Sequence, residues 1–369
     1  MILHKLKKSE KGMVITMSWE NNVRRVVPYV AGEQPKENNI IKLNTNECPY
    51  PPAPGVEKAL QGLDCEVLRK YPDPDVADLR AVLAKRYHVN MDQVFVGVGS
   101  DDVLSMAFLT YFNSEKPVLF PDITYSFYDV WADLYRIPYA CQKLDENFKI
   151  IKEDYFKENG GVVIANPNAP TGLAMPVSEI EDIIRANQDV VVIVDEAYVD
   201  FGGESALPLI EKYENLLVVQ TFSKSRSMAG MRIGVAFGNP KLIKYLEDAK
   251  FSFNSYTMNT TSIISGVASV EDEDYFRKTV AKVVATREKT KQELKELGFT
   301  FPDSKTNFIF AKHEKISGQE IFEALKENKI FVRHWNKPRI SDYLRISIGT
   351  DEEMQTMVDF LRKYITEKN

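Results

Sequence analysis

Two stretches of the sequence, VVVIVDEAY at residues 190–198 and LLVVQTFSK at residues 216–224, decide the fold. Each opens with a continuous apolar run, which is typical of a parallel strand buried on both faces, and closes in polar residues. Further apolar runs of this kind occupy residues 94–99, 117–120 and 161–166. Because helical patterns separate the runs, we predict an α/β fold in which helices flank a mostly parallel sheet.

The pattern changes after about residue 258. A charged helical stretch at 272–297 precedes two β-rich runs, at 306–312 and 343–349, and a last helix at 351–364. This part of the chain predicts a smaller α+β domain. The expected organisation is an N-terminal extension at 1–17, an arm that packs with the small domain at 18–43, a large domain at 44–258 and the small domain at 259–369.

Composition limits the possible functions. The 47 basic and 53 acidic residues give a net charge of -6, which argues against a general nucleic-acid binder. No apolar run reaches the roughly 20 residues that span a bilayer. Three cysteines, Cys48, Cys65 and Cys141, are too few and too scattered for a disulfide framework or a zinc site, and Cys48 and Cys65 could pair only if the fold brought them together. We therefore expect a cytoplasmic protein with no membrane segment and no metal site.

The first residues are basic but have no apolar stretch of the kind found in a signal peptide. We expect Met1–Lys11 to be a frayed extension, and Met13 and Met17 are candidate starts.

Several polar residues directly follow the apolar runs. Asp195 closes one run, Ser223 and Lys224 follow another, and Gly99 and Ser100 follow a third. Ligands of open parallel sheets bind beyond the carboxyl ends of the strands, so these residues are expected to meet at one site. A partly buried lysine amine is suited to Schiff-base formation, although an isolated loop lysine is more often a surface charge.

The residues around Lys224 form a longer motif. Ser223, Lys224, Gly230, Arg232 and Gly234 give S-K-x5-G-x-R-x-G. This motif resembles that of the cofactor lysine in fold-type I pyridoxal-phosphate aminotransferases. The resemblance implies a seven-stranded sheet, pyridoxal 5'-phosphate bound as a Schiff base to Lys224, and a cofactor phosphate held by Ser223 and Arg232. Arginine suits this role because its donors are fixed and bidentate.

The run D-E-A-Y at residues 195–198 also has the form found in that family. By resemblance, Asp195 pairs with the protonated pyridine nitrogen and keeps the ring an electron sink, while Tyr198 reaches the phenolic oxygen. A carboxylate at the end of an apolar strand would be costly if unpaired. The alternative is an aspartate that caps the following turn.

Two further segments match the family's cofactor site. Gly99, Ser100 and Asp101 begin a helix whose free amides and positive dipole end suit a phosphate, although Ser100 and Asp101 could equally be plain N-caps. Tyr125 matches the aromatic residue that stacks on the pyridine ring, and the alternative is a core tyrosine.

One position departs from the family pattern. The run Asn166-Pro-Asn168-Ala169-Pro-Thr-Gly has alanine where the family commonly has an asparagine that contacts the phenolic oxygen. Either Asn168 replaces that contact after a small backbone shift, or Tyr198 acts alone.

The small domain supplies candidate substrate contacts. Arg345, in YLRISIG, matches the family arginine that binds the substrate carboxylate, and Asn307 and Arg333 lie nearby in the pattern. An arginine within an apolar strand needs an anionic partner, which is either a buried acid or a ligand.

Three segments, VPYVAGE with Tyr29, LNTNECPYPP, and RKYPDPDVADLR with Tyr71, are similar to the histidinol-phosphate branch of the family. Cys48 stands where that branch usually has an asparagine. By resemblance, the chain forms a homodimer in which Tyr71 reaches the neighbour's cofactor phosphate, and Tyr29, Arg333 and Arg345 hold the anionic end of the substrate. The alternative for Tyr29 and Tyr71 is simple interface packing.

The resemblance implies a transaminase that interconverts histidinol phosphate and 2-oxoglutarate with imidazole acetol phosphate and glutamate. Lys224 would act as the general base. The alternatives are an aromatic amino-acid aminotransferase, a threonine-phosphate decarboxylase on the same scaffold and, least expected, a cofactor-sensing regulator, for whose DNA-binding domain the chain has no spare length.

Overall fold

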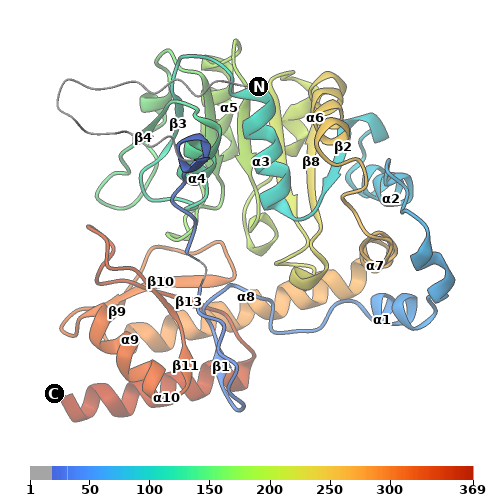
Figure 1. Cartoon of the computed structure of the whole chain (residues 1–369). Helices are drawn as coiled ribbons and strands as arrows, with labels where there is room; N and C mark the ends of the chain where they lie inside the picture. The colour runs from blue at the N-terminus through green and yellow to red at the C-terminus, as the bar shows by residue number, and fades with distance from the viewer. Residues whose placement is uncertain (1–18, 31, 369) are drawn as a thin grey trace.

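The computed structural model describes residues 19–30 and 32–368. The expected extension at 1–17, with Met13 and Met17, lies outside these residues. A seven-stranded sheet forms one part of the molecule, and a four-stranded sheet with a two-stranded one forms the other (Figure 1). This is the predicted arrangement of a large α/β part and a small α+β part.

The large sheet has the strand order β2-β8-β7-β6-β5-β3-β4. Neighbouring strands are parallel except for β8, which runs antiparallel to both β7 and β2. The prediction of a mostly parallel seven-stranded sheet is therefore confirmed. The strands are β2 (Val94–Gly97), β3 (Val118–Pro121), β4 (Tyr139–Gln142), β5 (Gly161–Ala165), β6 (Val192–Asp195), β7 (Leu216–Thr221) and β8 (Gly234–Gly238).

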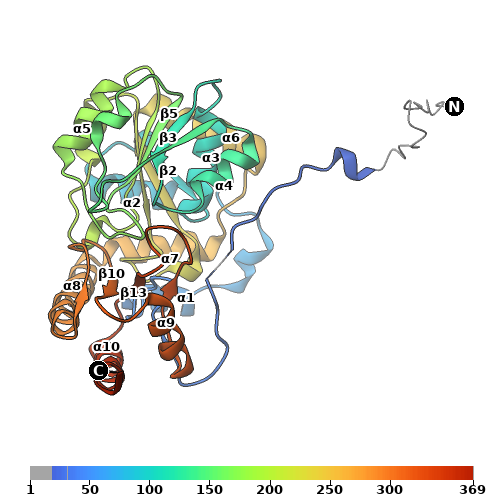
Figure 2. The same ribbon diagram turned by 90° about the vertical axis from the view of Figure 1, so that its left-hand side faces the viewer.

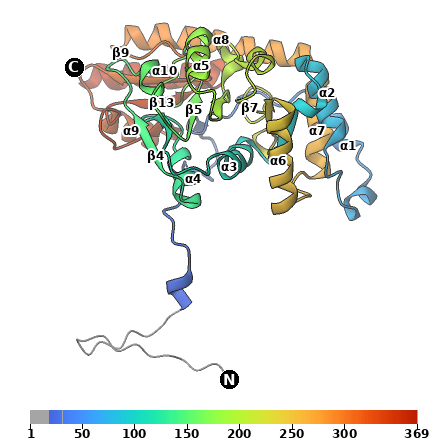
Figure 3. The same ribbon diagram turned by 90° about the horizontal axis from the view of Figure 1, so that it is seen from above.

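Alternate residues of the central strands face two helical layers. Val162 and Ile164 of β5 pack in the core with α2 (Ala77–Tyr87) and α5 (Val177–Ala186). Val163 and Ala165 pack with α3 (Ser100–Tyr111), α4 (Tyr128–Tyr135) and α6 (Pro240–Phe253). Figure 3 shows α3, α4 and α6 on the opposite side of the strands from α5. Burial on both faces explains why these strands are continuous apolar runs.

The small part is built on an antiparallel sheet of order β12-β13-β10-β9. Apolar residues of α8, α9 and α10 pack with the strands in one core. The two-stranded sheet pairs β1 with β11, so residues 41–42 contact the small part, while the arm expected at 18–43 stays a prediction. The elements are β1 (Ile41–Lys42), α8 (Glu273–Glu296), β9 (Phe299–Thr300), β10 (Phe308–His313), α9 (Gly318–Glu327), β11 (Ile330–Phe331), β12 (Arg333–His334), β13 (Leu344–Ser347) and α10 (Asp351–Lys368).

The helix α7 (Thr260–Glu271) does not join the small part. Its residues Ile263 and Val270 pack in the core of the large sheet together with Val56 of α1 (Pro54–Gln61). The packing of the large part thus continues past residue 258, where we expected the small domain to begin, and the exact boundary remains a proposal.

The first described segment extends away from the body. The 3-10 helix η1 (Trp19–Asn22) projects from it in two perpendicular views, and Trp19 is exposed (Figures 2 and 3). Farther along, the Tyr29 ring stacks on Phe127, which precedes α4, with 4.2 Å between centroids. The other 3-10 helices are η2 (Cys65–Arg69), η3 (Met91–Gln93), η4 (Lys152–Tyr155), η5 (Val199–Phe201), η6 (Leu207–Glu211) and η7 (Ala229–Met231).

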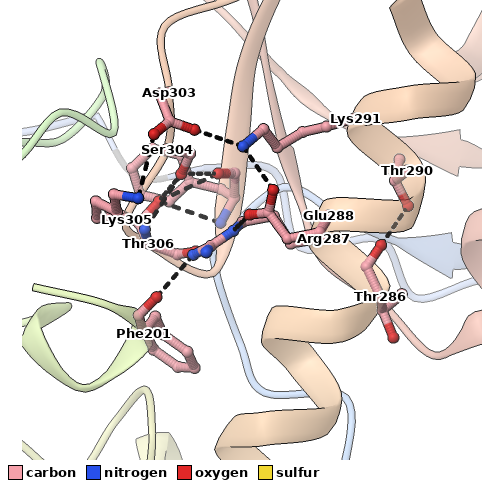
Figure 4. Close-up of polar contacts among 11 residues, drawn as sticks. Phe201, Thr286, Arg287, Glu288, Thr290, Lys291, Asp303, Ser304, Lys305 and Thr306 are labelled. Atoms are coloured by element: carbon pink, nitrogen blue, oxygen red, sulfur yellow. Dashed lines mark hydrogen bonds and ion pairs between the residues drawn. The ribbon is translucent and has the colours of Figure 1, made fainter.

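One buried arginine links the two parts. Arg287 of α8 donates through Nη1 to the carbonyl of Phe201 on the large side, at 2.8 Å, and to that of Thr306, at 2.7 Å (Figure 4). Lys291, one turn later, bridges Glu288 and Asp303. These bonds hold α8 against the loop that leads into β10.

Among the described residues, no helix has the length and apolar character that a bilayer crossing requires. Cys48, Cys65 and Cys141 are all free thiols, so Cys48 and Cys65 do not pair.

Candidate active site

Lys224 lies just beyond the carboxyl end of β7 and is half-buried. Its Nζ donates to the backbone carbonyl of Thr45 at 3.1 Å and lies 5.8 Å from the centroid of the Tyr198 ring. Thr45 belongs to the proline-rich segment at residues 44–55, so this segment contacts the amine. The hydrogen bond to the Thr45 carbonyl fixes the orientation of the amine.

Asp195, the last residue of β6, is 5% exposed. Its Oδ2 accepts a hydrogen bond from the hydroxyl of Tyr128 at 2.7 Å, and its Oδ1 accepts from the backbone N–H of Ala197 at 3.2 Å. Burial raises the pKa of this carboxyl to about 6, against the lowering effect of the two donors. A buried carboxylate of this kind is stabilised by a cationic partner such as a protonated ring nitrogen.

The start of α3 forms a cradle with Arg232. Gly99 has a positive φ of 87°, and a Cβ on it would lie 2.4 Å from Nη2 of Arg232. A Cβ on Gly234 would lie 2.2 Å from the backbone of Gly99. Arg232 Nη1 lies 3.4 Å from Ser223 Oγ. Only glycines allow the guanidinium, the hydroxyl and the helix N-terminus to come this close, and together they suit a phosphate.

Asp101 and Tyr125 belong to the same cluster. The Asp101 carboxylate accepts from Arg232 Nη2 at 3.3 Å and from the Tyr125 hydroxyl at 2.7 Å, and burial raises the pKa of Tyr125. Gly99 occupies the N-cap position and Ser100 is the first helical residue, so neither Ser100 nor Asp101 is the N-cap.

The side chain of Asn168, next to the position where the chain departs from the family motif, makes three hydrogen bonds. The Asn168 amide nitrogen donates to the carbonyl of Ile123 at 2.9 Å and to Thr171 Oγ1 at 3.0 Å, and its oxygen accepts from Thr124. Both amide hydrogens of Asn168 are used in these bonds, one to Thr171 of the same loop and one to Ile123 of the segment after β3, which favours the alternative that Tyr198 acts alone. The Tyr198 oxygen accepts from Asn46 Nδ2 at 2.9 Å.

A cleft of about 280 Å³ opens between the two parts beside this cluster. Its lining includes predicted residues from both sides, namely Tyr29, Tyr125, Arg333 and Arg345, together with Ala169, Trp335, Lys337 and Arg339. Three arginines and a lysine outnumber the one acid among the described residues of the lining, Asp122, which pairs with Arg339 at 3.1 Å, so the cleft is suitable for a substrate with anionic ends.

Among these cations, Arg345 is the best positioned to bind a substrate carboxylate. Its guanidinium lies between Phe308 and Trp335, at 5.5 and 5.3 Å from the ring centroids, and Nη2 donates to the carbonyl of Asn44 at 2.8 Å. Burial lowers the pKa of this guanidinium, and its Nε has no partner among the described residues. An arginine with unused, desolvated donors is ready to bind a carboxylate.

Two predicted residues lie apart from the cleft. Asn307 is fully buried and donates to the carbonyl of Asn46 at 3.0 Å, and its Oδ1 has no partner within residues 19–30 and 32–368. Tyr71 is 82% exposed and stacks on Tyr256 with 4.6 Å between centroids, so it is not part of the site formed by its own chain.

The sequence did not single out Tyr128, Asn46 or Trp335. Tyr128 lies three residues after Tyr125 and looks like one more aromatic residue in an amphipathic helix, while Asn46 lies in the polar run Asn44–Glu47. The available sequence signal for Tyr128 was a residue with a polar hydroxyl on the apolar face of a predicted helix.

Comparisons with known proteins identify the family of this chain. The family model for aminotransferase class I and II matches residues 38–361. The chain belongs to this family. The histidinol-phosphate aminotransferase of Lactococcus lactis subsp. cremoris is 56% identical over 352 residues, which cover 95% of this chain and 99% of the relative.

Solved structures share the fold. The histidinol-phosphate aminotransferase of Sinorhizobium meliloti, solved in complex with pyridoxal-5'-phosphate, aligns with a TM-score of 0.80 at 23% identity, covering 89% of this chain and 92% of that one. The L-threonine-O-3-phosphate decarboxylase of Porphyromonas gingivalis aligns with a TM-score of 0.76 at 22% identity, covering 89% and 100%. At these identities the likeness concerns the fold alone.

Family membership confirms the expected class, a pyridoxal-phosphate-dependent transaminase. The donor set fits that cofactor. Lys224 offers an amine, Asp195 an acceptor for a ring N–H, and the Gly99 cradle with Arg232 and Ser223 a phosphate site.

Proposed function

We propose that this aminotransferase interconverts histidinol phosphate and 2-oxoglutarate with imidazole acetol phosphate and glutamate. The observation that carries the proposal is the cationic cleft between the two parts, where Arg333 and Arg345 face the same space as Tyr29. A substrate that ends in a phosphate dianion suits several cations and a phenol better than one arginine alone. The 56% identity to the Lactococcus lactis enzyme supports the same substrate.

The residues divide the chemistry among them. When bound, pyridoxal 5'-phosphate supplies an aldehyde and an electron-accepting ring. Lys224 Nζ would hold the cofactor and, as a free amine, would remove the proton from the substrate's α-carbon as the general base. The Asp195 carboxylate holds a proton on the ring nitrogen, and the Tyr198 hydroxyl donates to the phenolic oxygen.

The remaining residues bind and orient the cofactor and the substrates. Ser223, Arg232 and the amides of Gly99, Ser100 and Asp101 hold the cofactor phosphate, with Tyr125 against the ring. Arg345 binds the carboxylate of glutamate, and Arg333 and Tyr29 assist with the phosphate of the other substrate. Arg345 is carried by β13, so closure of the small part moves it toward the substrate.

We also propose a cytoplasmic homodimer in which Tyr71 of each chain completes the other's phosphate site. The exposure of the Tyr71 and Trp19 side chains, at 82% and 75%, supports a partner surface at these positions.

The test is a set of half-reactions. The cofactor-loaded enzyme is mixed separately with histidinol phosphate, glutamate, phenylalanine, tyrosine and threonine phosphate, and conversion of the cofactor to its amine form is followed by absorbance. We expect rapid conversion by histidinol phosphate and glutamate. Faster conversion by phenylalanine or tyrosine would favour the aromatic alternative, and carbon dioxide released from threonine phosphate would favour the decarboxylase.

A further inference from the structure

Asn46 lies where the two parts of the molecule meet, and its side chain spans them. It is 1% exposed, and its backbone has a left-handed φ of 57°, a conformation that asparagine adopts more readily than most residues. Its Nδ2 donates to the Tyr198 hydroxyl on the large side at 2.9 Å. Its Oδ1 accepts from the Ser347 hydroxyl on the small side at 2.8 Å.

The small part fixes the orientation of this side chain. Ser347 Oγ also accepts from the backbone N–H of Asn46 at 2.9 Å, and Asn307 Nδ2 donates to the Asn46 carbonyl at 3.0 Å. In the structure the amide nitrogen of Asn46 points toward Tyr198 and its oxygen toward the Ser347 hydroxyl. Asn46 is thus bonded to two nearly inaccessible residues of the small part before it reaches Tyr198.

This arrangement determines what Tyr198 can do. Because Asn46 occupies a lone pair of the phenol oxygen, the hydroxyl proton has to point to another acceptor. The described residues offer no acceptor for the Tyr198 hydroxyl proton. Lys224, the proposed attachment point of the cofactor, has its Nζ 5.8 Å from the centroid of the Tyr198 ring. A hydroxyl whose oxygen accepts a hydrogen bond is a stronger donor, since bonds in a chain polarise one another.

We propose that Asn46 is a positioning residue that directs and strengthens the hydrogen bond from Tyr198 to the phenolic oxygen of the cofactor. The inference rests on the proposed function. It also bears on the departure from the family motif, because Ala169 has no side-chain donor and both amide hydrogens of Asn168 are used by Ile123 and Thr171. The bonds that Ser347 and Asn307 of the small part make with Asn46 would thereby affect a cofactor that is bound to the large part.

The effect is measurable without any substrate. A donor to the phenolic oxygen draws charge from it and weakens its hold on the proton that it shares with the Lys224 nitrogen. Loss of this donor therefore moves the midpoint pH of the cofactor's visible absorption band upward. Lys224 Nζ lies near the Tyr198 ring, and Tyr125, Tyr128 and Arg345 interact with Tyr198 electrostatically; the variants below leave these groups in place.

The experiment compares Asn46→Asp, Asn46→Gly and Tyr198→Phe with both double variants. Aspartate can accept from Tyr198 but cannot donate, so Asn46→Asp is expected to raise the midpoint by about one pH unit. Asn46→Gly keeps the left-handed backbone and is expected to give a smaller rise in the same direction. In the Tyr198→Phe background, the neutral change Asn46→Gly should not move the midpoint further, and Asn46→Asp should keep only the smaller part of its shift that comes from its negative charge.

Two outcomes would overturn the inference while leaving the aminotransferase assignment intact. One is an unchanged midpoint in Asn46→Asp when Tyr198→Phe shifts it, and the other is a shift that persists at full size without the Tyr198 hydroxyl. If Asn46→Asp does not fold, Ser347→Ala, which removes the anchor of the amide, should give a rise in the same direction, and an unchanged midpoint there would equally overturn it. A wild-type protein that shows no visible band would instead contradict the proposed function.

Discussion

The hydroxyl of Tyr128 lies 2.7 Å from Oδ2 of Asp195, and both side chains are buried. The bond joins the first turn of α4 to the end of β6 and opposes the effect of burial on the carboxyl. The acid that we propose as the partner of the ring nitrogen is therefore held and kept ionisable by a residue outside the family motifs that we recognised.

Replacing Tyr128 with phenylalanine removes that donor. Because burial then acts with less opposition, the pKa of Asp195 should rise, and kcat/KM at neutral pH should fall on the order of tenfold, with the acidic limb of its pH profile moved upward. Tyr155→Phe is the matched control, since the Tyr155 hydroxyl is buried without a partner among the described residues. Equal profiles for the two variants would show that the bond has no role in catalysis.

The stability of the cofactor-free protein should depend on pH through Asp195. Its folded pKa, about 6, lies above the ordinary value of 3.8, so the unfolded chain ionises first as the pH rises. Relative to Asp195→Asn, the wild type should lose on the order of 3 kcal/mol of unfolding free energy between pH 4 and 7. Denaturant titrations measure this difference. A constant gap across the range would mean that burial does not perturb the carboxyl.

Arg345→Lys should affect substrate binding and leave cofactor binding unchanged. Lysine retains a charge but loses the bidentate donors and the stacking between Phe308 and Trp335. We expect the KM for glutamate to rise roughly 10- to 100-fold with an unchanged cofactor spectrum. Arg333→Lys is the comparison, and it should raise the KM for histidinol phosphate more than that for glutamate. A loss of cofactor in Arg345→Lys would contradict this assignment.

A shared site makes a specific prediction for hybrid dimers. Lys224→Ala removes the amine of its own site, whereas Tyr71→Ala should weaken the phosphate site of the neighbour. Mixing the two variants would create one site with Lys224 from one chain and Tyr71 from the other, so activity should recover above that of either variant alone. If hybrids form, as mass spectrometry can verify, and no activity returns, Tyr71 does not act across an interface.

The sequence predicted those parts of the fold that depend on local pattern. Strands β5, β6 and β7 are buried on both faces and are continuous apolar runs, so the pattern revealed them. The edge strand β4, Tyr139–Gln142, is mostly accessible, and β8 begins and ends in glycine, so neither forms such a run.

The site residues also divide into those that a local pattern reveals and those that depend on contacts between distant segments. Lys224, Asp195 and Arg232 lie in motifs with fixed spacing, and the structure brings them to one edge of the sheet. The roles of Asn46 and Tyr128 depend on bonds to Tyr198 and Asp195, which are 152 and 67 positions away in the chain. Local pattern carries no information on such pairs. It also could not show that α7 packs with the large part.

The most direct test of the account is to locate the covalent link. Borohydride reduction of the cofactor-loaded enzyme, followed by peptide mapping, should place the label on the single peptide that contains Lys224, and Lys224→Ala should remain unlabelled and lack turnover. A label on a different lysine, or full activity in Lys224→Ala, would contradict the central claim.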